Sequence, residues 1–557
     1  MAISEELFHF ATRNGKALRE ESKEAHEYGA AHEFRVSNPD GAPSFSFFSL
    51  HALDNPFLFG YNKSDIRSYA SAQKGIMMNP LFSEFKRKFS LSMYKNMGIE
   101  MGEMSFLKDF VNDTRGDLYP LLDKSEDCKE TVAAGHYHVE GGHAERVFCQ
   151  LFPFATYEAQ AVSIAGEMGF VFRLPETAAF MRVAFDEMGG RLLYLCGEHS
   201  ESLPLPDTFT ETTPFLVTCR PGFFDIYYRQ NGAALYFATV EEPLFAESNR
   251  YATFKDSNVS FFAKGNVTAS RVTACLDNGV SIADYRMVKY EDGTPIEEDG
   301  KVFFTASIRT HAGNYQAIFS WVPGTMRLEM SGALFFDHGD GFWRGYIASS
   351  LVYHREKKQW YVWTSSFAHA HILAHGAFEG SPLYGINVAD VTILEKAGEN
   401  ANMEDFVGFV RDEDPDLIYD EENDRWLLAV CRIDKNTNQY VYVFFESNDP
   451  FCGFRYIGRG AEGASETGGC FVRYGGEIYF VCGNDFHKRA EYRIYGKDGM
   501  RLARFRYSDG GFRGWGCVIP AKRGSRTRYF WLTFDRHNGS DYNWSYGNFY
   551  CFEAEEE

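Results

Sequence analysis

Residues 413–432 read EDPDLIYDEENDRWLLAVCR, a run of carboxylates followed by an acidic turn and an aromatic-rich strand. The same phrase recurs from Ile282 as IADYRMV…EEDGKVFFTAS and from Ala464 as ASETGGCFVRYGGEIYFVCGND. Related units begin at Gly345 (GYIASSLVYHREKKQWYVWTSS) and at Gly516 (GCVIPAKRGSRTRYFWLTFDR). Groups of short strands that repeat roughly every 40–60 residues are typical of β-propellers, in which each group forms one blade. The C-terminal half therefore predicts an all-β fold with a five-bladed β-propeller.

Three of these units carry an acidic residue near their start: Asp284, Asp414 and Glu466. A propeller arranges its blades around one central channel, so residues that are far apart in the sequence can meet there. We therefore expect these three side chains to converge in one solvent-filled pocket at one end of the propeller axis.

The composition is that of an acidic globular protein. The chain has 557 residues, of which 45% are hydrophobic and 17% aromatic, and its net charge is −21. A chain of this length predicts more than one domain. No basic stripe is present that could release counterions from a nucleic acid or an anionic membrane, so neither is an expected partner.

The eleven cysteines are scattered and show neither CxxC nor Cys/His metal spacing, so we expect free thiols. No apolar run is long enough to span a bilayer, and the first residues lack the apolar segment of a secretory signal. These features predict a cytoplasmic protein that needs no cofactor and no metal. The sequence is compatible with a homo-oligomer but does not determine the oligomeric state.

The N-terminal part has a different pattern. Residues 1–270 are predicted to form a β-sandwich-like domain, because short strands such as FCQLFPFA, GFVFRL and RLLYLCG alternate with turn residues. Asn231-Gly232 separates two alternating runs and predicts a two-residue hairpin. Residues 61–125 show no alternation and indicate a helical or irregular insertion. The propeller is then assigned to residues 271–557.

The blade-start phrases resemble those of five-bladed β-propeller glycoside hydrolases of family 43 and, more distantly, families 32 and 68. In family 43 a first-blade Asp precedes an extended strand, as in ADYRMV, and an aromatic-Ala-Pro phrase opens the second unit, which YIASSLVY resembles with the Pro replaced. A later Asp-Pro precedes a strand, as in DPDLIYDEENDRWLL, and a Glu precedes a hairpin, as in SETGGCFVRYGGEIYF. The resemblance covers about half of the chain, from Asp284 to the end.

The resemblance implies carboxylate acid–base catalysis. Cleavage of a glycosidic bond needs an acid that protonates the departing oxygen and a second carboxylate that acts on water or on the anomeric carbon. By position, Asp284 would be the general base or nucleophile, Asp414 would tune the acid and hold the substrate, and Glu466 would be the proton donor. The expected enzyme is a glycoside hydrolase, inverting, that removes a terminal arabinofuranosyl or fructofuranosyl unit from a small carbohydrate or oligosaccharide.

Other interpretations of these carboxylates stay open. Asp412 and Asp416 compete with Asp414 for the same role, and Asp414 before Pro415 can also be an ordinary turn residue. Glu466 can also lie on a solvated face.

The candidate substrate-binding residues are Trp343, Arg344, His369 and Arg536. An aromatic ring and a cation just before the second unit could stack on a sugar and clamp it, and both could equally be structural. His369, His371 and His375 do not fit one metal site, because the first two share a face of a strand whereas the last two pair only on a helix. We therefore expect a single histidine near the axis and no zinc.

Two further functions are compatible with the same fold. A glycoside phosphorylase would use phosphate in place of water and needs basic groups, which Arg309, Arg344, Arg411 and Arg536 could supply. A non-catalytic carbohydrate-binding propeller would use its carboxylates only to bind hydroxyls. Phosphate dependence of turnover, or binding without product release, would separate these functions from hydrolysis.

Overall fold

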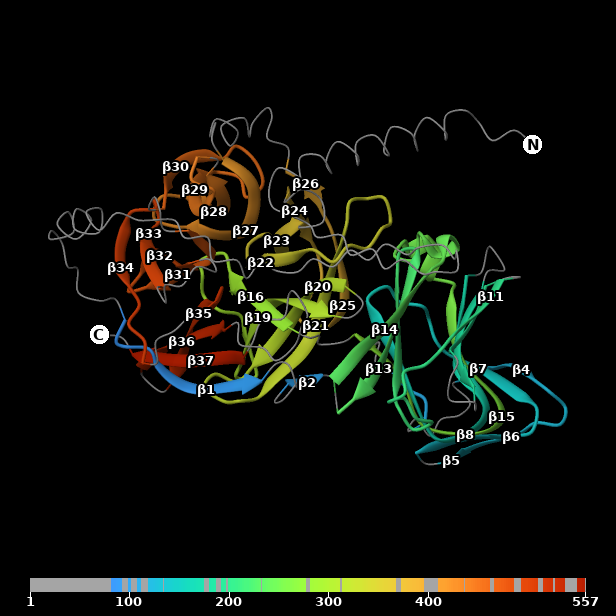
Figure 1. Ribbon diagram of the computed structural model, residues 1–557. Helices are drawn as coiled ribbons and strands as arrows, with labels where there is room; N and C mark the ends of the chain where they lie inside the picture. The colour runs from blue at the N-terminus through green and yellow to red at the C-terminus, as the bar shows by residue number, and fades with distance from the viewer. Residues whose placement is uncertain are drawn as a thin grey trace, which may run out of the picture. The chain divides into compact units, whose positions relative to one another are not determined.

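The computed structural model describes residues 82–555 except 93–98, 102–107, 112–118, 134, 175–179, 187–191, 197–198, 232, 277–280, 311–312, 367–371, 395–408, 435, 461–464, 485–491, 509–513, 524–525 and 536–547. The described part is almost entirely β-structure (Figure 1), with one short α-helix, α3 (Tyr251–Phe254), and one 3₁₀ turn, η3 (Pro243–Phe245). None of the helices in this part is long and apolar enough to cross a bilayer.

Five antiparallel sheets form the blades of a propeller, which confirms the predicted fold class. Blade 1 contains β16 (Ser281–Met287), β19 (Lys301–Thr310), β20 (Gly313–Trp321) and β21 (Leu328–Asp337). Blade 2 contains β22 (Ile347–His354), β23 (Gln359–Ser366), β24 (Ile372–Phe378) and β26 (Thr392–Ile393). Blade 3 contains β27 (Phe409–Asp420), β28 (Arg425–Asp434), β29 (Gln439–Ser447) and β30 (Arg455–Arg459).

Blade 4 contains β31 (Glu466–Tyr474), β32 (Glu477–Asn484), β33 (Tyr492–Gly496) and β34 (Arg501–Arg504). Blade 5 contains β35 (Cys517–Arg523), β36 (Arg526–Phe534) and β37 (Asn548–Glu555), and its outer strand is β1 (Lys86–Ser92) from the other end of the chain. Short parallel strands extend two blades: β2 (Ile99–Met101) and β25 (Gly385–Asp390) pair with β21, and β17 (Lys289–Tyr290) pairs with β22.

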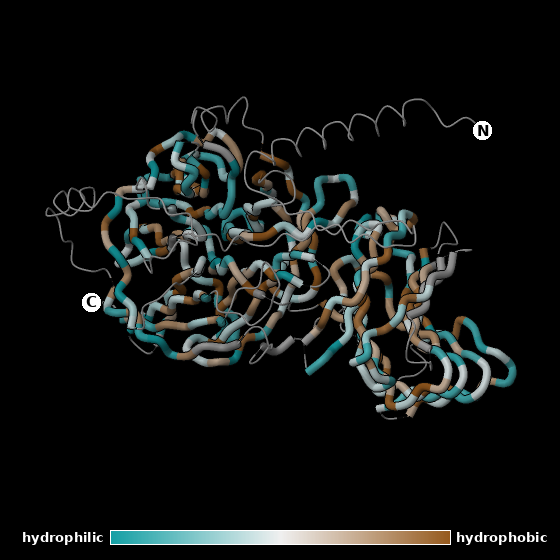
Figure 2. The backbone as a smooth tube through the Cα atoms, in the orientation of Figure 1, coloured by the Kyte–Doolittle hydropathy of each residue, from teal (hydrophilic) through white to brown (hydrophobic). Residues whose placement is uncertain are grey.

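The blades pack face to face, which explains why their central strands are apolar on both sides. Along β28, alternate side chains point to opposite faces of the sheet. Trp426, Leu428 and Val430 pack against blade 2, whereas Leu427 and Ala429 pack against blade 4. Figure 2 shows the resulting hydrophobic tracts along the strands. A strand that is buried on both faces reads as a continuous hydrophobic run, as in WLLAVC.

The N-terminal part is an antiparallel β-domain, as predicted. Two strands of 19 residues, β8 (Ala155–Arg173) and β15 (Asn258–Leu276), pair along their length and hold the others. These are β3 (Lys108–Asp109), β4 (Leu121–Lys124), β5 (Lys129–Ala133), β6 (His136–Glu140), β7 (His143–Cys149), β9 (Phe180–Asp186), β10 (Leu192–Cys196), β11 (His199–Leu203), β12 (Phe215–Arg220), β13 (Phe223–Gln230) and β14 (Ala233–Glu241).

Two local predictions can be compared with this sheet. The predicted hairpin is confirmed: Gln230 pairs with Ala233, and Asn231 between them has a φ of 52°. The boundary assigned between residues 270 and 271 falls inside β15. The cysteines whose side chains the structure describes are free thiols.

The interpretation of residues 61–125 as helical or irregular is wrong for the part that the structure describes, which holds β1 to β4 and no helix. Its first strand closes the propeller, because β1 pairs with β37 and so joins the two ends of the described chain. Pairing with a distant strand gives β1 its extended conformation, and such long-range pairing overrides a weak local pattern.

Phe85, immediately before β1, lets us test this closure. Its side chain is fully buried, stacks on Phe505 at 4.7 Å between ring centroids and contacts Trp531. We expect Phe85→Ala to lower the free energy of unfolding by about 3–5 kcal/mol, because it leaves a cavity between blades 4 and 5. Lys86→Ala, at the exposed neighbouring position, is the control and should change it by less than about 0.5 kcal/mol. Equal urea-unfolding curves for both variants would contradict a stabilising role of this N-terminal segment.

Candidate functional site

The innermost strands of four blades contain the same bulge. The register of each strand pair shifts between Ala283 and Arg286, Ile347 and Ser350, Glu413 and Asp416, and Thr467 and Cys470. In each bulge the first extra residue has a positive φ: 54° at Asp284, 55° at Ala348, 48° at Asp414 and 60° at Gly468. A bulge with a left-handed first residue bends the strand and redirects its side chains, and such bulges are common next to active sites.

This register shows which predicted residues are equivalent. Asp284 and Asp414 occupy the same bulge position in blades 1 and 3, and Ala348 occupies it in blade 2. Glu466 does not occupy it in blade 4, because it lies two residues before Gly468 at the start of β31.

Asp284 and Asp414 influence each other electrostatically. Asp284 is only 3% exposed. Burial first, and then repulsion from Asp414, raise the pKa of Asp284 to about 6, against the opposing effects of Arg309, of a hydrogen bond with Ser307 and of Arg286. A carboxylate with such a pKa is ionised at neutral pH yet basic enough to accept a proton, as a general base requires.

Asp414 connects blade 3 to its two neighbours. It is 4% exposed, and its Oδ2 accepts hydrogen bonds from the Thr467 hydroxyl at 2.5 Å and from the Gly468 N–H at 3.0 Å, both in blade 4. Its own N–H donates to Ser365 Oγ in blade 2 at 3.0 Å. Asp414 is therefore a buried residue within the strand β27, and the alternative that it is an ordinary turn residue before Pro415 is wrong.

The carboxylate of Glu466 has a different set of partners. It is fully buried, and its Oε1 accepts hydrogen bonds from Arg493 Nη1 at 2.5 Å and from the Tyr495 hydroxyl, both on β33. Its Oε2 has no hydrogen-bond partner among the described residues. Burial raises the pKa of Glu466, whereas Arg493 and Tyr495 oppose that shift. This environment excludes the solvated-face alternative.

The three carboxylates are thus joined only in part. The charge of Asp414 acts on Asp284 directly, whereas the segment that starts at Glu466 bonds to Asp414 through Thr467 and Gly468, not through the Glu466 carboxylate. All three are nearly inaccessible, rather than lining an open cavity among the described residues.

The competing acidic residues have structural partners. Asp416 accepts hydrogen bonds from Lys289 Nζ at 2.7 and 2.9 Å, from Ser350 Oγ at 2.6 Å and from the Phe471 N–H at 2.7 Å. Asp412 forms a buried ion pair with Arg432 at 2.6 Å. Because these donors occupy Asp416 on both oxygens, it has little capacity left for a substrate.

Trp343 packs in an aromatic cluster rather than beside the carboxylates. Its ring contacts Phe152, Phe254 and Phe335, and it stacks on Tyr251 with an interplanar angle of 7°. These contacts support the structural alternative for this residue.

Arg344 is also engaged away from the carboxylate pair. It forms an ion pair with Asp340 through two hydrogen bonds, at 2.6 and 2.9 Å, and donates to the carbonyl of Phe342. Because the guanidinium is held by this bidentate ion pair with Asp340, it is not directed at the carboxylate pair. Arg411, a second cation of the phosphorylase alternative, is exposed at the start of the acidic run.

The predicted His369 and Arg536 lie outside the described residues, as does His371. His375 lies on β24, where its ring stacks on Phe451 and burial lowers its pKa to about 4, so the imidazole is neutral. Within the described ranges no group of three or more His, Cys, Asp or Glu side chains could hold a metal ion.

Sequence reasoning missed two residues of this site. Ser307 bonds to Asp284 and also accepts the Ala348 N–H at 2.8 Å, so it links blades 1 and 2. Arg286 is fully buried, interacts electrostatically with both aspartates and opposes the rise in the pKa of Asp284. The only sequence signal was that Arg286 lies inside an otherwise apolar strand phrase, ADYRMV.

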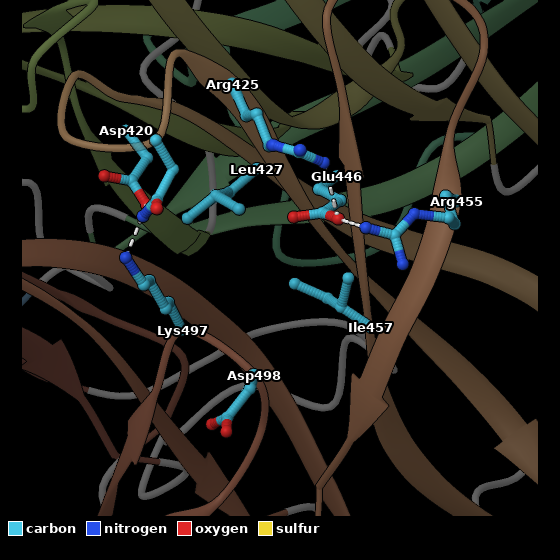
Figure 3. A pocket seen from close by; sticks show the side chains of 9 residues that line it. Asp420, Arg425, Leu427, Glu446, Arg455, Ile457, Lys497 and Asp498 are labelled. Atoms are coloured by element: carbon cyan, nitrogen blue, oxygen red, sulfur yellow. Dashed lines mark hydrogen bonds and ion pairs between the residues drawn. The ribbon is translucent and has the colours of Figure 1, made fainter.

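A cavity of about 410 Å³ lies elsewhere, between blades 3 and 4 (Figure 3). Its lining residues are Asp420, Asn423, Arg425, Leu427, Glu446, Arg455, Ile457, Lys497 and Asp498. The charges in it are largely paired: Lys497 bonds to Asp420 at 2.5 Å, and Glu446 bonds to Arg425 and Arg455. None of the three predicted carboxylates lines this cavity.

Neither a protein-family model nor a curated protein matches the sequence. Among solved structures, the chain is similar to an exo-β-1,3-galactanase from Clostridium thermocellum, with 10% identity, coverage of 48% of this chain and 62% of that chain, and a TM-score of 0.35. It is also similar to the catalytic domain of the family 62 α-L-arabinofuranosidase from Coprinopsis cinerea, with 13% identity, coverage of 48% and 92%, and a TM-score of 0.32.

A third similar structure is a family 117 glycoside hydrolase from the marine bacterium Zobellia galactanivorans, with 12% identity, coverage of 50% and 91%, and a TM-score of 0.33. The chain is therefore structurally similar, at low identity, to β-propeller glycoside hydrolases. These low scores carry no functional argument, so the function has to be argued from this chain's own residues.

The raised pKa of Asp284 makes stability depend on pH. The folded protein binds this proton more tightly than the unfolded chain, whose Asp pKa is near 3.8. Ionised Asp284 therefore lowers stability above about pH 6, and this effect disappears as the pH falls towards 3.8. We expect Asp284→Asn to stabilise the protein by roughly 3 kcal/mol at neutral pH and to have little effect near pH 4.

Urea unfolding at both pH values measures this difference. Asp299→Asn is the matched control, because Asp299 is exposed and also has a positive φ, of 50°. A destabilising effect of Asp284→Asn at neutral pH would show that the charged form is the one favoured by its surroundings.

Proposed function

We propose that this protein is a glycosidase in which Asp284 and Asp414 act together on a glycosidic bond. The single observation that carries the proposal is the Asp284–Asp414 pair: two buried carboxylates at equivalent bulges of different blades, where burial and the nearby charge of Asp414 raise the pKa of Asp284 to about 6. Asp416, by contrast, is neutralised by an ion pair with Lys289. Perturbed, mutually repelling carboxylates are instead typical of acid–base catalysis.

In the proposed mechanism Asp284 is the general base that activates water. Above about pH 6 it is ionised and can accept the proton of a water molecule that attacks the anomeric carbon. Asp414 repels the charge of Asp284 and so keeps it basic, and it is itself fixed by the Thr467 hydroxyl and the Gly468 N–H. The fixed geometry supports a role for Asp414 in orienting the site.

Glu466 is the proposed proton donor. Its burial favours the protonated form, and Oε2 has no partner among the described residues and could carry the proton. The hydrogen bonds from Arg493 and Tyr495 hold the other oxygen in place. In this arrangement the acid would protonate the departing oxygen while Asp284 activates water, which is inverting hydrolysis.

For the substrate, we propose a terminal furanoside, arabinofuranosyl or fructofuranosyl, of a small carbohydrate. Support for this finer statement is the resemblance of the blade-start phrases to family 43. Trp343 and Arg344 do not support it, because their contacts are to the aromatic cluster and to Asp340.

The activity test uses 4-nitrophenyl glycosides, with α-L-arabinofuranoside first, and wild type beside Asp284→Asn, Asp414→Asn and Glu466→Gln. We expect each variant to lower kcat/KM by at least about 100-fold, because general acid–base groups typically contribute that much or more. The exposed-site controls Asp299→Asn and Glu477→Gln should keep wild-type activity. Full activity of the Asp284→Asn and Glu466→Gln variants would overturn the proposal.

The same assays separate the competing functions. Turnover that requires inorganic phosphate would indicate a phosphorylase, and retention of sugar without product release would indicate a binding propeller. Both outcomes contradict hydrolysis.

The pH profile is a separate prediction. Since Asp284 must be ionised to act as a base, kcat/KM should fall as the pH drops through about 6, with a single-proton slope. Measurement of kcat/KM from about pH 4 to 8 on the best aryl glycoside tests this. A profile that is flat across pH 6 would exclude Asp284 as the base.

A further inference from the structure

Asp284 and Asp414 are buried, and neither forms an ion pair with another residue in the described part of the chain. Among the described residues, the oxygen partners of Asp414 are the neutral Thr467 hydroxyl and Gly468 N–H, and the hydrogen-bond partner of Asp284 is the neutral Ser307. A buried charge costs several kcal/mol, on the order of the stability of a whole domain, unless a nearby opposite charge compensates it. Two such carboxylates side by side need a counterion at longer range.

Most buried cations near the axis already belong to another carboxylate. Lys289 forms an ion pair with Asp416, Arg432 with Asp412, and Arg493 with Glu466. The arginines that act on Asp284 are Arg309 and Arg286.

Arg286 interacts electrostatically with both members of the pair. It lies on β16 two residues after Asp284, immediately after the bulge, and its side chain is fully buried. The groups packed around it come from the other blades: Tyr442 of β29, Asp414 and Asp416 of β27, Cys470 of β31 and Cys517 of β35. Burial lowers the pKa of Arg286, but Tyr442, Asp414, Cys470 and Asp416 outweigh that effect and raise it, so the guanidinium stays charged.

The hydrogen bonds of Arg286 do not neutralise its charge. Its Nη1 donates to the carbonyl of Tyr285 at 3.1 Å. Its Nε and Nη2 have no hydrogen-bond partner among the described residues. A guanidinium carries five N–H donors, so a fully buried one with two unpartnered nitrogens is costly and is not explained by packing alone.

We propose that Arg286 is a positioning residue that compensates the buried carboxylates of Asp284 and Asp414 inside the propeller. It is buried with unpartnered nitrogens and interacts electrostatically with both residues, so it lowers the cost of burying them. Its meaning for catalysis rests on the proposed function, because a base must be ionised before it can accept a proton. Its electrostatic role can be tested without any substrate.

Besides burial, four groups affect the ionisation of Asp284. They are Asp414 on β27, Arg309 and Ser307 on β19, and Arg286 on its own strand. Asp414 opposes ionisation of Asp284, and the other three favour it. Removal of Arg286 should therefore raise the pH at which Asp284 titrates.

The experiment measures the stability difference between proteins with Asp284 and with Asn at that position, as a function of pH, in three backgrounds. With native Arg286 we expect the difference to grow between about pH 3.8 and 6 and to level off above about pH 6. With Arg286→Met, of similar length but neutral, we expect the pH at which the difference levels off to rise by about 1–3 pH units. With Arg286→Lys, which restores the charge, we expect a return towards the native value. An unchanged levelling-off pH in the Met background, or Lys behaving as Met does, overturns the proposal.

A second comparison tests the proposal even if the Arg286→Met variant does not fold. If Arg286 compensates the two carboxylates, the triple variant Arg286→Met, Asp284→Asn, Asp414→Asn should fold with a normal circular dichroism spectrum, since the repulsion is gone. If the triple variant is as unfolded as Arg286→Met, the arginine acts through packing and the proposal is wrong. Because neither readout needs turnover, absence of glycosidase activity would refute the proposed function and leave this result standing.

Discussion

Burial of negative charge at the centre of the propeller is the constraint on which the rest of the structure depends. The strand β27 carries Asp412, Asp414 and Asp416 in buried positions, and neighbouring elements have to satisfy them. Asp416 takes donors from blade 2, from β17 and from blade 4, and Asp414 bonds to blades 2 and 4. These hydrogen bonds join three blades at the axis, where apolar contacts alone would fix no particular register. The same charges that connect the blades also supply the chemistry proposed for them.

Away from the axis, apolar side chains that alternate between the two faces of each strand stabilise the packing of neighbouring blades. Side chains on successive residues of a strand point to opposite neighbours, so one strand such as β28 contributes to two separate apolar clusters. Closure of the ring is achieved by β1, whose pairing with β37 gives the last blade its outer strand. A closed ring leaves few unpaired strand edges, which is the general advantage of propellers among all-β folds.

The candidate site was only partly predictable. The sequence indicated Asp284 and Asp414 because both stand at the start of a repeated phrase, and the structure has them at equivalent bulges. It could not indicate that Glu466 would bind Arg493 and Tyr495, since those partners lie in a strand two positions away across the sheet. Trp343 next to a blade start looked like a sugar platform, yet it packs in an aromatic cluster with Phe152 and Phe254, and only tertiary contacts could reveal that.

The sequence by itself determined the repeat, the five blades and the antiparallel N-terminal domain, because alternation and turn residues are local properties that survive in any arrangement of the units. Tertiary structure alone decided that residues 86–92 form a strand, because their partner lies at the other end of the chain. It also decided which buried carboxylates are neutralised and which are not. That outcome depends on the distance to Lys289, Arg286 and Arg309, and electrostatic compensation between residues from different strands leaves no trace in the local pattern of the chain.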